Sequence, residues 1–148
     1  MKIRSLLLVL ALVLSFPLSL HAQERQFDMK LENLWTEYAD CSAYYFLVSD
    51  ALVKSGKAES AQTYLKVQEN ALMMAFAIAS QQREQKMAAK VVGLTFDQTK
   101  NKMLKDINYR YENMVILNHE YLERCKDCMN SPNPKAVKAV NDLTKKAQ

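Results

Sequence analysis

The chain has 148 residues and a formal net charge of +4, from 20 Lys and Arg against 16 Asp and Glu. Basic and acidic residues are interleaved along the sequence, so the charge pattern does not predict nucleic-acid binding. Two glycines and three prolines leave few turn formers for a β protein, whereas the abundant Ala, Leu, Lys, Gln and Glu all favour helices. Composition therefore predicts an all-α protein.

Residues 1–22 have the pattern of a secretory signal peptide. A basic start, Met1–Arg4, precedes an apolar run at 6–20, which is shorter than the roughly 20 residues that a membrane-spanning helix needs. Ala22 provides a small residue at the expected cleavage position; an uncleaved anchor helix is the alternative. We expect a periplasmic or secreted protein with no stable membrane anchor after cleavage and one helical-bundle domain over residues 23–148.

A first long helix is predicted over about 27–54. Apolar residues recur there at alternating spacings of four and three, which is the pattern of an amphipathic helix. Gly56 supplies the C-terminal cap that ends the helix. The predicted inward stripe consists of Phe27, Leu31, Leu34, Tyr38, Cys41, Tyr45, Val48 and Leu52.

Three further helices complete the predicted antiparallel bundle of three long helices and one short one. The second runs over about 59–92, with an apolar segment at 71–79 that we expect to be its most buried part. Gly93 breaks the chain, and Thr95 with Gln98 forms a capping box for a third helix to about residue 127. The segment 129–134, which contains two prolines, separates it from a short helix at 135–146.

Three cysteines in an exported chain suggest one disulfide and one spare thiol. We favour a bond between Cys41 and Cys125, which leaves Cys128 free and able to link two copies of the chain. The alternatives are a Cys41–Cys128 bond and a C-x-x-C redox pair of Cys125 and Cys128. The redox pair would lie at a helix C-terminus, where the helix dipole does not lower a thiol pKa.

The register of the predicted helices conflicts with the favoured disulfide. Counting about 1.5 Å per residue from tight turns at Gly56 and Gly93 puts Cys125 roughly 13 Å from the level of Cys41, whereas a disulfide needs Cα atoms within about 7 Å. Either the second helix bends or ends early, or the turns are loose. A third option is a hairpin of the second and third helices that projects past the start of the first.

The densest group of aromatic residues lies in the first helix, in the stretch 35–46. Trp35, Tyr44 and Phe46 either contact another helix or form an exposed contact patch for a partner. The sequence contains no catalytic motif and no cofactor or metal motif that we can place. We therefore expect a non-catalytic protein that acts through protein–protein contacts, for example as an accessory subunit of an envelope assembly. The alternative is a metal-binding, apolar-ligand-binding or thiol-redox module that uses Cys125 and Cys128.

The residues around the cysteines resemble a group of small helical proteins that Gram-negative bacteria export. The resemblance rests on Trp35, the segment Tyr38–Tyr45, the spacing Tyr121-x-x-x-Cys125, and Asn133-Pro134. It implies a periplasmic helical bundle tied by a disulfide and implies no defined activity. Cys128 departs from the single cysteine pair of that group.

Overall fold

The computed structural model describes residues 28–146, which are helical except for short connections. The long helices are α2 (Met29–Lys54), α3 (Ala58–Gln82) and α4 (Gln85–Asp106). A 3₁₀ turn, η1 (Tyr111–Asn113), leads into α5 (Met114–Asn130), and α6 (Pro134–Lys146) follows. The predicted all-α class is confirmed for this part of the chain, whereas the predicted signal peptide lies outside the described residues.

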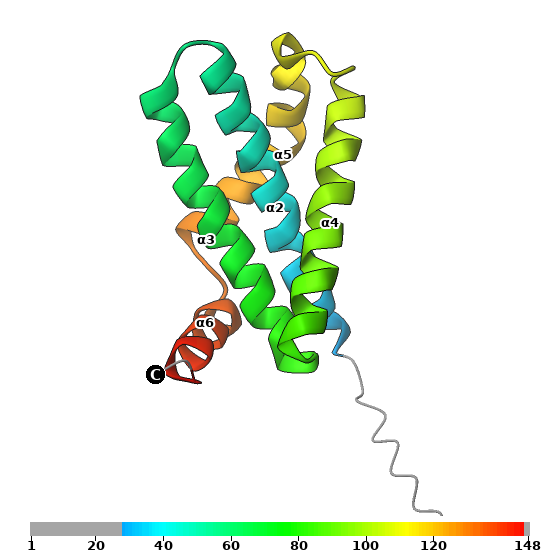
Figure 1. Cartoon of the computed structure of the whole chain (residues 1–148), viewed down its shortest axis with the longest axis vertical. Coiled ribbons are helices and arrows are strands. Elements are labelled where there is room, and N and C mark those ends of the chain that lie inside the picture. Colours follow the sequence, from blue (N-terminus) through cyan, green and yellow to red (C-terminus); the bar gives the residue numbers. More distant parts are fainter. Residues whose placement is uncertain (1–27, 147–148) are drawn as a thin grey trace, which may run out of the picture.

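Helix α2 is the centre of the molecule and packs against α3, α4 and α5 (Figure 1). Its first turn is capped by the Asp28 side chain, which accepts a hydrogen bond from the Lys30 N–H at 2.9 Å. At its other end Gly56 adopts φ +76°, a left-handed conformation that glycine takes without strain. Both ends of the first predicted helix therefore agree with the structure to within about two residues.

The second helix ends ten residues earlier than the sequence predicts, at Gln82 rather than about Val92. The extended backbone of Arg83 and Glu84 makes the turn, and Gly93 lies inside α4. A glycine within a helix costs only about 1 kcal/mol, so it does not dictate a break. The predicted capping box at Thr95 is wrong for the same reason, because α4 is already helical there.

The predicted third helix is likewise divided in two. The chain leaves the helical conformation at Asn108 and Tyr109, whose φ angles are +53° and +57°, and reverses direction before α5. The Asn113 side chain donates a hydrogen bond to the Ile107 carbonyl at 3.1 Å and closes this turn. The structure thus has five α-helices in the described residues where the sequence predicted four.

These two corrections resolve the conflict over the register of the cysteines. Cys41 lies 13 residues before the end of α2, and Cys125 lies 11 residues after the start of α5. At 1.5 Å per residue the two are about 20 Å and 17 Å from the same end of the bundle. The projecting hairpin is also excluded, because the α3–α4 turn lies beside the start of α2, where the Asp28 N–H donates to Gln82.

The core consists of two groups of buried side chains. The disulfide cluster lies near the α4–α5 loop and joins α2, α4 and α5. The α6 cluster is rich in alanine and joins α2, α3, α4 and α6. Within the apolar segment 71–79 the alanines and Ile78 are buried, but Met73 is exposed. The segment is therefore less completely covered than predicted.

Candidate functional site

Cys41 on α2 and Cys125 on α5 form the disulfide that the sequence favoured, with their Cα atoms 5.2 Å apart. Both side chains are fully buried in the disulfide cluster. The bond holds α5 in one orientation on α2. Cys128 remains free, so neither alternative pairing is formed in this structure.

Cys128 lies one helical turn after Cys125 and is half-buried. It borders an open hollow of about 560 Å³ between α2 and the α5–α6 connection. Burial raises the pKa of the Cys128 thiol to about 11, although a hydrogen bond with the Tyr38 hydroxyl opposes the shift. A thiol with this pKa is protonated at neutral pH and is a poor nucleophile.

The surroundings of Cys128 predict a slow reaction with alkylating agents. We expect one labelled thiol per folded chain at pH 7.5, reacting at least about tenfold more slowly than the same thiol in denaturant, since only the thiolate is nucleophilic. Intact mass measured over time gives both the number of labels and the rate. The non-reduced denatured chain should still take one label, and the reduced chain three. Equal rates for the folded and denatured chain would contradict the buried, protonated thiol.

Trp35 and Tyr44 contact other helices, which is the first of the two alternatives that the sequence left open, and they do not form an exposed contact patch. Trp35 is buried in the α6 cluster, and Tyr44 is only 1% exposed. Tyr44 donates a hydrogen bond to Asn118 Oδ1 at 2.8 Å. Phe46 is partly buried and packs edge-on against Phe96. Because α2 is covered on several sides, residues outside its predicted inward stripe are buried as well.

A polar cluster fastens the α3–α4 turn to the start of α2. Arg83 donates two hydrogen bonds to the Glu32 carboxylate, at 2.7 and 2.6 Å, and its guanidinium lies 5.5 Å from the Trp35 ring centre. Gln82 also donates to Glu32. The hydrogen bond from Arg83 is the main cause that lowers the Glu32 pKa. This cluster explains why the helix breaks at Arg83.

A second polar cluster fastens the α4–α5 loop to the end of α2. The Tyr111 hydroxyl donates a hydrogen bond to the Asp50 carboxylate. Lys54 forms an ion pair with Asp50 at 2.9 Å and lies 3.8 Å from the Tyr111 ring centre. Beside this cluster, Tyr109 projects from the loop and is 64% exposed. The loop is therefore anchored at Tyr111 and displays Tyr109 to solvent.

The outer face of α5 carries apolar side chains that the fold leaves exposed. Leu117, Tyr121 and Cys125 are buried on the inner face, whereas Val115 is 70% exposed, and Ile116 and Leu122 are also exposed. Val115 and Leu122 are seven residues apart and lie on one face of the helix. We call Val115, Ile116 and Leu122 the α5 outer surface. Charged residues surround it, including Glu120, Glu123 and Lys126.

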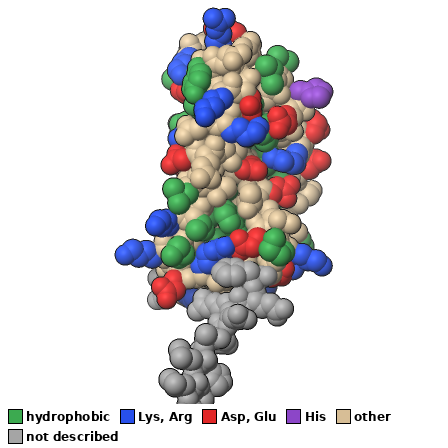
Figure 2. Space-filling view, turned by 90° about the vertical axis from the view of Figure 1, so that its right-hand side faces the viewer, with side chains coloured by type: hydrophobic (Ala, Val, Ile, Leu, Met, Phe, Trp, Pro, Cys, Tyr) green, Lys and Arg blue, Asp and Glu red, His purple; other side chains and the backbone are tan. Residues whose placement is uncertain are grey.

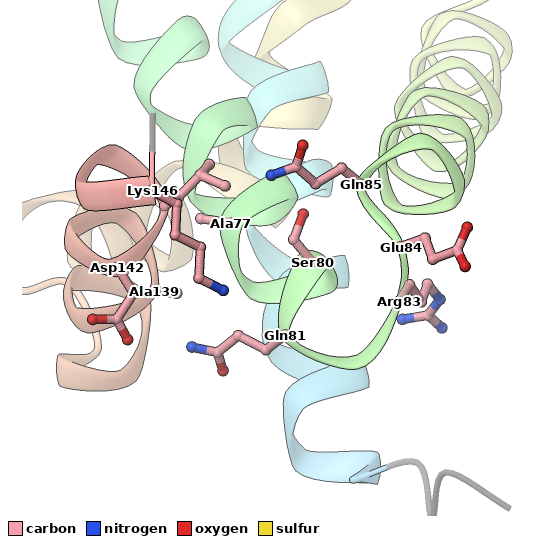
Figure 3. Close-up of a pocket in the computed structure, with 10 residues that line it drawn as sticks. Ala77, Ser80, Gln81, Arg83, Glu84, Gln85, Ala139, Asp142 and Lys146 are labelled. Carbon is pink, nitrogen blue, oxygen red and sulfur yellow. The ribbon is translucent and has the colours of Figure 1, made fainter. Parts of the chain in front are cut away.

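An open hollow of about 450 Å³ lies where α6 meets the α3–α4 turn. Figure 3 shows the Lys146 side chain reaching from α6 past Ala77 and the Gln85 amide pointing toward Ala77 from the other side, while the Arg83 and Glu84 side chains point away. Basic, acidic and amide groups border this hollow together. Because groups of both charges line the hollow, its lining does not favour an anionic ligand over a cationic one.

No protein-family model, characterised protein or solved structure matches this chain. Within residues 28–146, no three His, Cys, Asp or Glu side chains are grouped as metal ligands. Cys41 and Cys125 are bonded to each other, so neither offers a thiolate to a metal. None of the helices between Asp28 and Lys146 combines the length and apolar character needed to cross a membrane.

Proposed function

We propose that the chain is exported, loses residues 1–22, and acts in the periplasm or outside the cell through contact with another protein. Its role would be non-catalytic, as an accessory subunit of an envelope assembly. The observation that carries the proposal is the α5 outer surface. A disulfide on the inner face of α5 holds exposed apolar side chains of the outer face in a fixed position, which lowers the entropy lost on binding a partner.

Two features of the chain support export. The apolar run at 6–20 is typical of a signal peptide, and a buried disulfide is typical of proteins that fold in an oxidising compartment. A metal-binding or redox role through Cys125 and Cys128 is the weaker proposal. Cys125 is bonded to Cys41, and the Cys128 thiol has a raised pKa. Dimerisation through Cys128 requires that partly buried thiol to become accessible.

Photo-crosslinking in cells tests both parts of the proposal. A photoreactive amino acid placed at Val115 or Leu122 should give a discrete, larger product in the periplasmic fraction, and the monomer mass should correspond to a chain starting at Gln23. The matched control carries the same amino acid at Lys66, an exposed position on α3. The proposal predicts products at the α5 positions and none at Lys66.

Two results would count against the proposal. Retention of the full-length chain in the cytoplasm would contradict export. Export without any crosslinked product at Val115 or Leu122 would contradict the α5 contact surface while leaving export in place. A product whose mass is twice that of the chain would identify a second copy as the partner.

A further inference from the structure

Folding gathers basic residues at one end of the molecule. We define the α6 end as residues 28–32, 82–90 and 134–146, where α2 and α4 begin, α3 ends and α6 lies (Figure 1). These segments contain eight Lys and Arg but only four Asp and Glu, whereas the rest of residues 28–146 contains nine basic and eleven acidic residues. Figure 2 shows basic side chains around this lower end; on the same face other basic side chains lie near the top, and most acidic ones lie on the right.

Two of the four acidic residues of the α6 end are paired with two of its basic residues, so its excess of four positive charges is carried by the other residues. Glu32 is bonded to Arg83, and Asp28 caps α2 and lies 4.0 Å from Lys135. The remaining lysines of the α6 end project into solvent from three helices: Lys30, Lys86, Lys90, Lys138, Lys145 and Lys146. The surface positive charge therefore exceeds the negative charge there.

Exposed apolar residues stand next to three of these lysines in the sequence. Met29, next to Lys30, is 67% exposed, and Met87, next to Lys86, is also exposed. Val137 precedes Lys138 on α6 and is exposed too. Apolar side chains combined with lysines are typical of surfaces that lie at a membrane interface, where the lysines contact lipid phosphates.

The chain enters the described fold at the same end. Asp28 lies at the α6 end, and the apolar run at 6–20 ends only eight residues before it. Eight residues span at most about 28 Å when fully extended. Before cleavage, a signal peptide bound to a membrane would therefore keep the α6 end within about that distance of the lipid surface.

We propose that the α6 end docks on a membrane surface that contains anionic phospholipid. The lysines contact the phosphates, and Met29, Met87 and Val137 contact the interface. The inference goes beyond the proposed function, because it concerns another surface and does not depend on a partner at α5. It differs from a membrane anchor in that binding is reversible and requires no spanning helix. A membrane is favoured over a soluble polyanion because only lipid provides apolar contacts for the exposed methionines.

Binding to vesicles tests the proposal. Every described helix lies between residues 28 and 146, so a chain starting at Gln23 retains the fold and removes the apolar run from the experiment. This chain should sediment with vesicles of phosphatidylcholine and phosphatidylglycerol in equal amounts, but not with phosphatidylcholine alone. Added salt should release it, since exposed charges are screened.

A charge-reversal pair locates the binding surface. The variant Lys86→Glu/Lys138→Glu/Lys145→Glu should bind the anionic vesicles at least about 100-fold more weakly, because each lysine near the surface contributes about fivefold. The control Lys57→Glu/Lys66→Glu/Lys105→Glu has the same net charge and changes exposed lysines outside the α6 end. It should lose less than about fivefold. Circular dichroism confirms that both variants are folded.

Three outcomes would overturn the proposal. One is the absence of binding to anionic vesicles by the unmodified chain. Another is an equal loss in both triple variants, which would show that only net charge matters. The third is binding to a DNA duplex or heparin without binding to vesicles, which would assign the surface to a soluble polyanion. None of these results bears on the crosslinking test of the α5 outer surface.

Discussion

Replacing Cys41 and Cys125 together by alanine is expected to lower the free energy of unfolding by about 4 kcal/mol. The two cysteines are 84 residues apart in sequence, and closing so long a loop restricts the unfolded chain by roughly this amount in the chain-entropy model. The total stability of a domain of this size is about 5–15 kcal/mol, so the loss is a large fraction of it. Thermal and urea unfolding monitored by circular dichroism measure the effect.

Cys128→Ala is the matched control for the disulfide variant. It changes the third cysteine, which is half-buried and free, and we expect it to cost less than about 1 kcal/mol. A double variant no less stable than this control would show that the disulfide contributes little. Loss of the α5 crosslink in the double variant, with retained helical content, would show in addition that the disulfide orients the α5 outer surface.

Tyr44→Ala is expected to lower the free energy of unfolding by about 3–5 kcal/mol, as truncation of a large buried aromatic residue does. Tyr44 is almost fully buried, its ring stacks on Tyr121 with ring centres 6.0 Å apart, and its hydroxyl bonds to Asn118. Truncation leaves a cavity beside the disulfide and an amide without its partner. Urea unfolding of the purified variant measures the change.

Tyr109→Ala makes the same chemical change at an exposed position. Tyr109 is 64% exposed. Both variants replace a tyrosine by alanine, so the difference between their free energies of unfolding reports how deeply each tyrosine is buried. We expect the Tyr109 variant to lie within about 0.5 kcal/mol of the unmodified chain. If Tyr44→Ala were equally mild, Tyr44 would be a surface residue, which was the second of the two alternatives that the sequence left open.

The positions of the helix breaks show where local sequence information is insufficient. Gly93 is a poor helix residue, yet α4 continues through it, because its cost is small compared with the packing of a long helix. The break occurs instead at Arg83, where the bonds to Glu32 hold the turn against α2. The reversal at Asn108 and Tyr109 likewise accompanies the contact between Tyr111 and Asp50. Both contacts join residues more than 50 positions apart.

The candidate surfaces show the same dependence on long-range contacts. Trp35 and Tyr44 are buried because α2 packs against helices on several sides. The residue pattern of a single helix does not show how many other helices pack against it. Four basic residues of the α6 end, at 30 and 83–90, are interleaved with acidic residues along the chain, and the other four lie together in α6. They share one end only because α2, α4 and α6 bring separate segments together. The order of charged residues along the sequence therefore does not show how charge is distributed over the surface.

The sequence by itself determined the helical class, the bounds of α2 and the choice of Cys41 and Cys125 as the favoured pair. These properties depend on residue composition, on spacing within one helix and on the number of cysteines, all of which are local or countable. The tertiary structure decided where the later helices break, which aromatic residues are buried and which charges lie together. Those depend on hydrogen bonds and packing between distant segments, whose energies exceed the small differences in helix propensity.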